Sequence, residues 1–314
     1  MKKFAMIGVG GYIAPRHLKA IKDTGNVLVA ALDKNDSVGI IDRFFPDADF
    51  FTEFERFDRH IDKLHRKKGR QIDYVTICSP NYLHDAHVRF ALRIGADAIC
   101  EKPLVLNPWN IDGLAEIAKE TGRKINTILQ LRLHPSIIEL KEKIDKSDQV
   151  HDVELTYITS RGHWYMASWK GDEKKSGGIA TNIGVHFFDM LLWVFGPARK
   201  SVINLYQPRR AAGYLELEKA RVRWFLSLNR EDLPKKPDPD KPMTYRSIKI
   251  DGQQVEFSDG FTELHTDSYK KILTGNGFTL DDVRPSIQLV SDIRSAQPIG
   301  KIGQYHQMLN KICQ

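Results

Sequence analysis

The feature that most constrains the fold is a glycine-rich segment that lies between an apolar run and a helical pattern near the N-terminus. The apolar run at 3–9 predicts a buried strand, and the pattern at 15–24 predicts a helix. A strand, a tight glycine turn and a helix in this order are typical of a Rossmann-type dinucleotide site. In such a site Gly8 permits the turn, and Gly10 lets the backbone approach a pyrophosphate at the helix N-terminus. The third position of the G-x-G-x-x-G pattern is Ile13, which predicts looser packing of the helix on the strand.

An acidic residue supports the same interpretation more strongly than the glycines do. A second apolar run, 27–32, ends at Asp33, about twenty positions after Ile13. A carboxylate at that point can accept hydrogen bonds from adenosine ribose hydroxyls and would repel a 2′-phosphate. The alternative is that the glycines only connect two elements and Asp33 only ends a strand. Because strand, turn, helix and spacing agree, we expect NAD as the cofactor; Lys34 follows directly and could soften the preference over NADP.

The pattern of the first part of the chain indicates a parallel sheet. Apolar runs alternate with helical patterns, which predicts an α/β, doubly wound Rossmann sheet with helices on both faces. The further runs lie at 72–78, 97–100 and 125–131, and the helical patterns at 53–67, 84–94 and 109–121.

After about residue 150 the pattern changes to strands without intervening helices, apart from one helical segment at 183–195. This arrangement predicts a C-terminal α+β domain with an open, largely antiparallel sheet. Its expected strands lie at 153–159, 201–207, 213–217, 221–228 and 247–257, the last with a hairpin turn at Asp251-Gly252. The proline-rich stretch 231–242 is expected to be a surface loop. We therefore expect a Rossmann NAD-binding domain at 1–130 and a substrate-binding and oligomerisation domain at 131–314.

Composition limits the classes of partner. No apolar stretch approaches the roughly 20 residues that span a bilayer, and the first residues lack a signal-peptide pattern, so we expect no membrane and a cytoplasmic protein. The formal net charge is +7, but the basic residues are scattered, which favours an anionic small molecule over nucleic acid. No metal-ligand spacing occurs. The three cysteines, Cys78, Cys100 and Cys313, are expected to be small buried residues.

Three polar segments are candidates for the chemistry. In open α/β sheets ligands bind beyond the carboxyl ends of the strands. Two loops follow strands there, Ser79-Pro80-Asn81-Tyr82-Leu83-His84 and Cys100-Glu101-Lys102-Pro103. A third segment, Gly177-Gly178-Ile179-Ala180-Thr181-Asn182-Ile183-Gly184-Val185-His186-Phe187-Phe188-Asp189, opens the apolar helix. Taken singly, Glu-Lys-Pro is an ordinary turn and His186 is a buried core residue. Together behind a dinucleotide fingerprint they indicate an enzyme.

These segments resemble the family of glucose–fructose oxidoreductases, inositol dehydrogenases and rhizopine catabolism proteins over nearly the whole chain. Four further segments resemble the bacterial UDP-N-acetyl-2-amino-2-deoxy-D-glucuronate 3-dehydrogenases within that family. They are GYIAPRH at 11–17, TYITSRG at 156–162, TNIGVH at 181–186 and ARVRWF at 220–225. The resemblance implies NAD-dependent oxidation of the sugar C3 hydroxyl to the 3-keto sugar, in lipopolysaccharide or O-antigen sugar biosynthesis. It also implies a homotetramer whose open sheets form interfaces.

The chemistry needs a base, because a secondary alcohol loses its proton as its hydride moves to nicotinamide C4. By resemblance, Lys102 and His186 flank the reacting carbon, and the sequence leaves open which of them is the base. Asn182 stands where many relatives carry Asp, so we expect it to hydrogen-bond the substrate. Relatives can hold NADH tightly, and 2-oxoglutarate is a candidate hydride acceptor whose use the sequence also leaves open.

The predicted site therefore has three groups of residues. The catalytic residues are Lys102 and His186. The cofactor-binding residues are Gly8, Gly10, Gly11, Tyr12, Ile13, Asp33, Lys34, Ser79, Asn81, His84, Glu101, Lys102, Gln130 and Trp169. The substrate-binding residues are Lys102, Arg161, Tyr165, Asn182 and His186, with Lys170, Arg132 and His134 as further candidates for the same cleft. Arg161 is the first candidate for an anionic group.

Two alternatives stay open. A dehydrogenase of a free sugar or inositol would use the same scaffold, and a non-catalytic NAD-binding sensor would need neither base. The presence of both Lys102 and His186 argues against the sensor. The polar tail at 295–304 is a candidate for reaching a neighbouring subunit.

Overall fold

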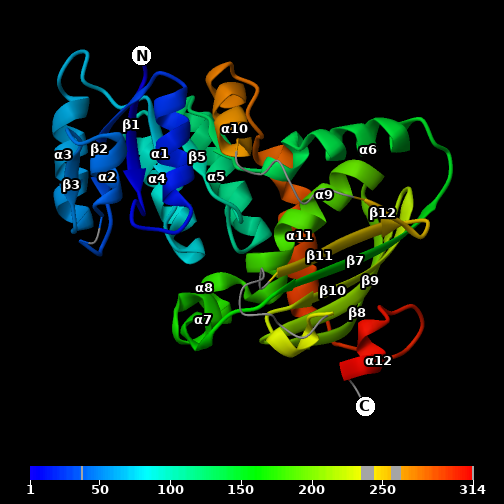
Figure 1. The fold of residues 1–314 in the computed structure, drawn as a ribbon. Coiled ribbons are helices and arrows are strands. Elements are labelled where there is room, and N and C mark those ends of the chain that lie inside the picture. The colour runs from blue at the N-terminus through cyan, green and yellow to red at the C-terminus, as the bar shows by residue number, and fades with distance from the viewer. Residues whose placement is uncertain (37, 235–243, 256–262, 313–314) are drawn as a thin grey trace. The chain divides into compact units, whose positions relative to one another are not determined.

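A computed structural model describes residues 1–36, 38–234, 244–255 and 263–312 (Figure 1). Most of the predicted loop at 231–242, the last two residues of the run at 247–257, and Cys313 lie outside the described residues. The chain divides into two compact units, Met1–Leu133 with Phe261–Arg284, and His134–Gly260 with Pro285–Gln314. The sequence analysis places the boundary at 130/131 and leaves 261–284 in the second part, whereas the structure groups that segment with the first unit.

The first unit is built on a six-stranded sheet in which all the pairings are parallel. Its strands are β1 (Lys3–Ile7), β2 (Val27–Leu32), β3 (Asp49–Phe51), β4 (Tyr74–Ile77), β5 (Asp97–Cys100) and β6 (Ile125–Thr127). Their order in the sheet is β3-β2-β1-β4-β5-β6, which is the Rossmann order. The predicted doubly wound parallel sheet is therefore confirmed. The run at 125–131 ends as a strand at Thr127, because the chain then turns into a 3₁₀ helix at Gln130–Leu133.

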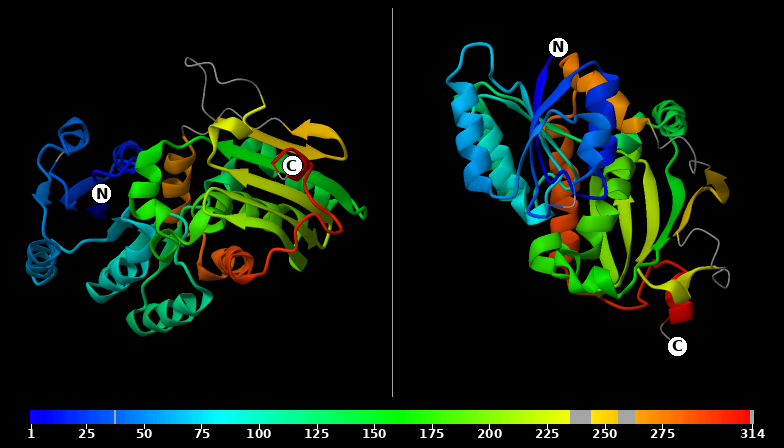
Figure 2. Two further views of the ribbon diagram at one scale, coloured as in Figure 1. Left: turned by 90° about the horizontal axis from the view of Figure 1, so that it is seen from below. Right: turned by 60° about the vertical axis from the view of Figure 1, so that its left-hand side comes forward.

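Helices cover both faces of this sheet, as the right-hand view of Figure 2 shows. They are α1 (Ala14–Asp23), α2 (Ile40–Phe44), α3 (Phe54–His65), α4 (His84–Arg93), α5 (Pro108–Thr121) and α10 (Leu264–Leu273). Helix α10 packs against α1, so residues that are distant in sequence share one core with β1. The core of the other face includes the rings of Phe57 and Phe90, whose centroids are 5.7 Å apart.

The second unit holds a six-stranded sheet with the order β12-β11-β7-β10-β9-β8. Its strands are β7 (His151–Thr159), β8 (Ala198–Gln207), β9 (Arg210–Leu217), β10 (Ala220–Ser227), β11 (Thr244–Ile250) and β12 (Gln253–Val255). Only β7 and β10 pair in parallel among these strands, so the prediction of a largely antiparallel sheet is confirmed. The hairpin between β11 and β12 turns at Asp251, whose φ is 50°.

The helices assigned to this part of the chain are α6 (Pro135–Asp145), α7 (His163–Ala167), α8 (Glu173–Ser176), α9 (Val185–Phe195), α11 (Leu280–Ser295) and α12 (Met308–Ile312). The division between the units falls inside α11. Helix α6 packs on α9, which a π-helical turn at Ala180–Gly184 precedes. Among the described residues one helical stretch, Glu173–Phe195, has the length and apolar composition to cross a membrane, and 78% of its most apolar window is buried in the protein. A buried core helix has the same properties, so this is weak evidence for a membrane span.

Candidate functional site

The glycine turn of the first unit is enforced by its neighbours. Gly8 has a φ of +88°, and a Cβ atom there would lie 2.6 Å from backbone atoms of Cys78 and Ser79. Its amide nitrogen donates to the carbonyl oxygen of Leu32 at 2.8 Å. The turn is therefore held between the ends of β2 and β4, where no larger residue fits.

The structure brings Asp33 to this turn. The Oδ2 atom of Asp33 accepts a hydrogen bond from the amide of Gly10 at 2.8 Å, and Oδ1 accepts one from the amide of Asn35 at 3.0 Å. Gly11 completes the turn by donating to the carbonyl of Gly8 at 3.1 Å. The carboxylate thus fixes the glycine backbone at the carboxyl edge of the sheet.

The remaining predicted residues of this segment are Tyr12, Ile13 and Lys34. Tyr12 is 94% exposed, Lys34 is also exposed, and Ile13 is the N-cap residue of α1 without a side-chain capping hydrogen bond. Because the side chain of Ile13 cannot accept a hydrogen bond, it does not cap the first N–H groups of α1. Uncapped N–H groups at a helix N-terminus suit an anion.

The loop after β4 is tied to the loop after β5 by a buried histidine. Both ring nitrogens of His84 face main-chain carbonyls, Nδ1 that of Pro103 at 2.7 Å and Nε2 that of Ser79 at 2.8 Å. Burial lowers the pKa of His84 despite these carbonyls. Ser79 Oγ lies 2.8 Å from Nδ1 of His87, whose pKa burial lowers to about 4. Asn81 is buried in the same loop.

Glu101 and Lys102 stand at the end of β5. Glu101 is buried, and its Oε1 accepts hydrogen bonds from Nε2 of His17 at 2.9 Å and from Nε2 of His265 at 3.1 Å. Its Oε2 accepts from the amide of Lys102 at 3.2 Å. Lys102 is half-buried, and a cis peptide joins it to Pro103. Sequence reasoning did not select His17 or His265. The first lies within the GYIAPRH segment, but nothing local marks the second.

Two further predicted residues lie at the end of β6. The Oε1 atom of Gln130 is buried and has no hydrogen-bond partner among the residues that the structure describes. Arg132 is buried as well, and its guanidinium donates to the main-chain carbonyl of Asp282 at 2.8 Å and pairs with the carboxylate of Asp282 at 3.3 Å. Arg132 and Asp282 both belong to the first unit, so Arg132 holds the first turn of α11 within that unit, while His134 belongs to the second unit.

In the second unit the structure brings two predicted substrate residues together. The side-chain amide of Asn182 donates to the hydroxyl of Tyr165 at 2.6 Å. Burial raises the pKa of Tyr165, so the phenol stays neutral. Asn182 lies in the π-helical turn, and His186 follows in the first turn of α9. Turns of this type occur frequently at functional sites.

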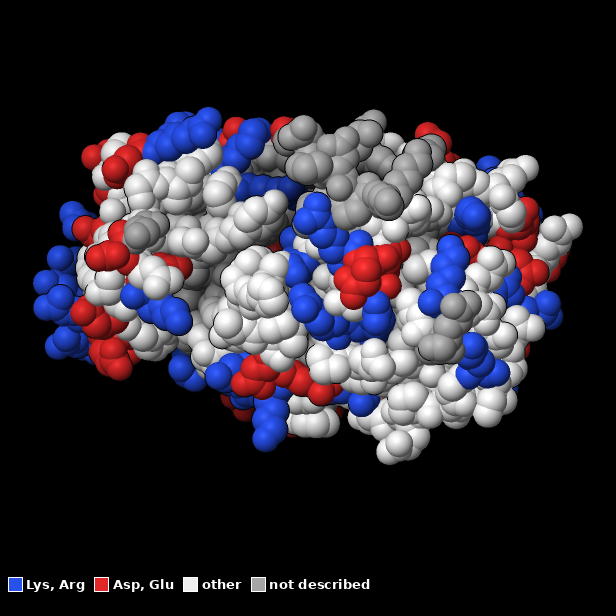
Figure 3. Space-filling view, turned by 60° about the horizontal axis from the view of Figure 1, so that its bottom comes forward, with Lys and Arg blue, Asp and Glu red and all other residues white. Residues whose placement is uncertain are grey.

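A cationic group with aromatic neighbours lies in the same unit. The ammonium of Lys170 is 5.3 Å from the ring centroid of Trp164 and 4.8 Å from that of Trp169. Burial, followed by the positive charge of Arg161, lowers the pKa of Lys170. Lys170 and Arg161 thus form a local positive field. On the face shown in Figure 3, by contrast, basic side chains form separate groups with acidic ones between them.

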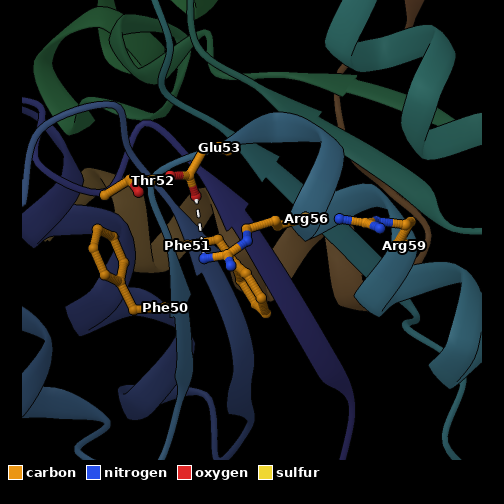
Figure 4. Close-up of a pocket in the computed structure, with 6 residues that line it drawn as sticks. All are labelled: Phe50, Phe51, Thr52, Glu53, Arg56 and Arg59. Atoms are coloured by element: carbon orange, nitrogen blue, oxygen red, sulfur yellow. Dashed lines mark ion pairs between the residues drawn. The ribbon is translucent and has the colours of Figure 1, made fainter.

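A cavity of about 390 Å³ opens at the end of β3 and the start of α3 (Figure 4). It is lined by Phe50, Phe51, Thr52, Glu53, Arg56 and Arg59, and Arg56 pairs with Glu53 at 3.9 Å. The carbonyl of Phe51 accepts the amide of Asp33 at 3.1 Å, so the cavity adjoins the end of β2. No residue of the predicted site lines it.

The comparisons with known proteins agree with this geometry. Residues 2–128 match an oxidoreductase family with an NAD-binding Rossmann fold, and residues 141–234 match the C-terminal alpha/beta domain of the same family. The chain is similar to the WlbA (WbpB) dehydrogenase from Thermus thermophilus, with 50% identity, a TM-score of 0.93, and coverage of 98% of this chain and 99% of that one. That dehydrogenase has been solved with NAD and alpha-ketoglutarate, and with NAD and UDP-GlcNAcA.

Curated relatives match over shorter stretches. D-glucoside 3-dehydrogenase of Escherichia coli (strain K12) is 28% identical over 41% of this chain and 38% of its own length. Inositol 2-dehydrogenase of Rhizobium meliloti (strain 1021) is 28% identical over 64% of this chain and 57% of its own length. The chain thus spans less than two thirds of these relatives. With two matching domains and a full-length structural likeness, the chain belongs to the family of NAD-binding oxidoreductases that includes glucose–fructose oxidoreductase, inositol dehydrogenase and the rhizopine catabolism proteins.

Proposed function

We propose that this chain catalyses the NAD-dependent oxidation of the C3 hydroxyl of UDP-N-acetyl-2-amino-2-deoxy-D-glucuronate to the 3-keto sugar. The observation that carries the proposal is the 50% identity, over nearly the whole of both chains, to a dehydrogenase solved with NAD and UDP-GlcNAcA. We assign the reaction to lipopolysaccharide or O-antigen sugar biosynthesis in the cytoplasm.

The residues of the first unit fit NAD. Gly8 forms the tight turn at a position where a Cβ atom would clash with the backbone of Cys78 and Ser79, and Asp33 both fixes Gly10 and presents a carboxylate at the end of β2. The buried Oε1 of Gln130 is an acceptor without a partner among the described residues, which fits a donor group of the cofactor. When bound, NAD accepts the hydride from the sugar. We place the remaining predicted cofactor residues, Tyr12, Lys34, Ser79, Asn81, His84, Glu101 and Trp169, around it.

The chain's own contribution is to bind the sugar and to take up the proton of its hydroxyl. Lys102 and His186 are the proposed residues for the proton transfer, since both side chains carry exchangeable protons and both are half-buried. The side-chain amide of Asn182, which donates to the hydroxyl of Tyr165 at 2.6 Å, is the proposed hydrogen-bonding group for the substrate. Arg161 and Lys170 supply positive charge for an anionic ligand, the uronate or the diphosphate.

The assay follows NADH absorbance with purified protein and a panel of UDP-sugars, free hexoses and inositols, each with and without 2-oxoglutarate. We expect turnover only with the UDP-N-acetylglucosaminuronate. If NADH is retained between turnovers and 2-oxoglutarate accepts its hydride, NADH does not accumulate. Turnover is then measured by chromatography of the products, and we expect the 3-keto sugar and 2-hydroxyglutarate to form in equal amounts only when 2-oxoglutarate is present. Turnover of a free sugar or inositol would instead favour the simpler dehydrogenase. NAD binding without any turnover would favour the sensor.

Variants assign the roles. We expect Lys102→Ala and His186→Asn each to lower kcat by about two to four orders of magnitude, as loss of a general acid or base does, with NAD binding retained. The matched controls are Lys124→Ala and His65→Asn, which change an exposed lysine and an exposed histidine of the first unit. Full activity in Lys102→Ala or His186→Asn would contradict the proposed role of that residue.

A further inference from the structure

Five polar side chains from four elements of the first unit form a buried cluster, and the proposed function assigns a role to only one of them, Glu101. Each is at most 6% exposed. The members are Thr76 of β4, His17 of α1, His265 and Tyr269 of α10, and Glu101, which follows β5. We name this set the Glu101 cluster. Buried polar groups are expensive unless hydrogen-bonded, so its arrangement needs a physical account.

The distances define one chain of hydrogen bonds. Thr76 Oγ1 lies 2.8 Å from the hydroxyl oxygen of Tyr269, which lies 2.9 Å from Nδ1 of His17. Nε2 of His17 is 2.9 Å from Oε1 of Glu101. Nε2 of His265 is 3.1 Å from the same oxygen.

The chemistry of the groups sets the direction of these bonds. A carboxylate only accepts, so Nε2 must carry the proton in both imidazoles. A neutral His17 then accepts at Nδ1 from the hydroxyl of Tyr269, which in turn accepts from Thr76. His17 therefore donates to Glu101 as a neutral ring, and His265 donates to the same oxygen from Nε2, while the Nδ1 atom of His265 is buried without a hydrogen-bond partner among the described residues.

The net charge of the cluster resides on Glu101. Burial alone would raise the pKa of Glu101, but the hydrogen bonds from His17 and His265 outweigh it and hold that pKa well below its usual range. Burial lowers the pKa of His17 and raises that of Tyr269, so both stay neutral. His84, Cys78 and Cys100 also interact electrostatically with Glu101, and burial shifts the pKa of each towards its neutral form.

The second carboxylate oxygen connects the cluster to the proposed catalytic residue, because Oε2 accepts from the amide of Lys102 at 3.2 Å. We propose that His17 and His265 are positioning residues, which hold Glu101 as an oriented carboxylate that fixes the main chain of Lys102. This inference rests on the proposed function, in which Lys102 contacts the substrate. It extends the active site to α10, a helix far along the chain.

A metal ion is the other arrangement that two histidines and a glutamate suggest, since one ligand atom of each lies within 4.8 Å of the others. A zinc ion would sit about 2.0–2.2 Å from each atom and would need unprotonated ring nitrogens. The two Nε2 atoms instead lie at hydrogen-bond distance from one shared oxygen. Hydrogen bonds from the two Nε2–H groups to this oxygen explain the distances without a metal ion. The test below includes metal binding as one of its possible results.

The test compares two substitutions at each histidine. His17→Phe and His265→Phe remove the donor but keep a ring, whereas His17→Gln and His265→Gln keep an amide N–H near the position of Nε2. We expect the Phe variants to lower kcat for the UDP-sugar about ten- to a hundredfold, as small displacements of a reacting group do, with the KM for NAD unchanged. The Gln variants should recover most of the activity. The control is His151→Phe, because His151 pairs with the carboxylate of Asp251 in the second unit and should leave kcat unchanged.

A second readout separates positioning from simple packing. In Glu101→Gln the negative charge is lost, which disfavours the ammonium form of Lys102, so the limb of the kcat–pH profile that Lys102→Ala removes should move to lower pH. An unshifted limb, equal losses in the Phe and Gln variants, or unchanged kcat in the Phe variants would overturn the proposal.

A third readout does not depend on turnover. The ¹⁵N chemical shifts should report a proton on Nε2 of both His17 and His265, and an unprotonated Nδ1 in His17. An unprotonated Nε2 in either ring, or an imidazolium at His17, would overturn the proposal. So would a stoichiometric metal whose removal by a chelator abolishes activity. A parent chain that oxidises no UDP-sugar would overturn the proposed function, while the shifts would still decide whether both rings donate to Glu101.

Discussion

At the scale of single residues, Gly8 is the position whose identity the fold most strictly requires. Gly8→Ala would combine a positive φ with contacts of 2.6 Å to the backbone leaving β4. We expect this change to lower the free energy of unfolding by roughly 2–4 kcal/mol, because strain and overpacking add. The measurement is urea denaturation followed by circular dichroism.

Gly25→Ala is the matched control, because Gly25 also has a positive φ, +71°, but no atom within 4 Å of the added Cβ. It should cost about 1–2 kcal/mol, the strain alone. Equal losses in the two variants would show that the contacts with Cys78 and Ser79 are relieved by small shifts.

The candidate site shows what residue patterns can and cannot predict. The contact between Asp33 and Gly10 follows from spacing, because both flank the carboxyl ends of neighbouring strands. The contact of His265 with Glu101 joins positions 164 apart and has no local signal. Only the folded chain shows that Glu101 has both carboxylate oxygens engaged.

At the scale of elements, the turn residue of the β11–β12 hairpin, Asp251, joins the hairpin to strand β7 by hydrogen bonds. Asp251 accepts hydrogen bonds from Nδ1 of His151 at 2.7 Å and from the amide of Asp152 at 2.9 Å. The bond from His151, followed by that from the backbone, lowers the pKa of Asp251. A carboxyl group whose pKa is depressed by folding stabilises the fold above its unfolded pKa, and this stabilisation is lost as the pH falls.

We therefore expect the difference in unfolding free energy between the parent and Asp251→Asn to be constant above about pH 5 and to shrink below about pH 4. Because Asp251 is half exposed, the difference should be under about 1 kcal/mol. Asparagine tolerates the positive φ, so the substitution removes the charge and one of the two acceptor oxygens without straining the turn. Urea titrations at several pH values measure it, with Asp267→Asn as a control at a half-exposed aspartate on α10. A difference that grows at low pH would contradict the assignment.

Elements with a clear hydrophobic periodicity could be predicted from the sequence. Three others could not, because their sequences lack the local pattern of a strand or a helix. Strand β3 has three residues, too few to show alternation. Helix α10 turns polar residues towards the core, His265, Thr266 and Ser268 among them, so it lacks an apolar stripe. Helix α11 contains Pro285, which ordinarily marks a helix boundary. In each case tertiary contacts supply what the local pattern lacks.

At the scale of the whole molecule, the chain does not complete one unit before starting the next. The segment that includes α10 belongs to the first unit, although it follows the sheet of the second in sequence. A single domain boundary in the sequence therefore cannot describe the first unit, because that unit is made of two separate segments. The part of the chain after α11 belongs to the second unit, where Nε2 of His306 lies 2.9 Å from Thr156 Oγ1 on β7.

The segment between α11 and His306 lies along the edge strand β8. The amide of Ile299 donates to the carbonyl of Ile203 at 2.9 Å, and the amide of Gly300 donates to the carbonyl of Asn204 at 3.1 Å. The side chain of Asn204 returns a hydrogen bond to the carbonyl of Gly300 at 2.9 Å. The backbone of this segment is thereby fixed, yet Ile302 is 65% exposed. An apolar side chain held in solvent by an ordered backbone is suited to contact another subunit.

We propose a homotetramer in which Ile302 lies at a contact between subunits, and we expect light scattering to give four times the mass of one chain. Burying an isoleucine contributes about 1.5–3 kcal/mol, and symmetry repeats the contact, so Ile302→Glu should produce smaller species with unchanged circular dichroism. The control is Ile138→Glu, at a partly exposed isoleucine on α6. A monomeric parent would overturn the tetramer. If the tetramer instead survives Ile302→Glu and dissociates in Ile138→Glu, the contact between subunits lies at α6. Only an isoleucine that is buried between subunits loses an apolar contact when glutamate replaces it.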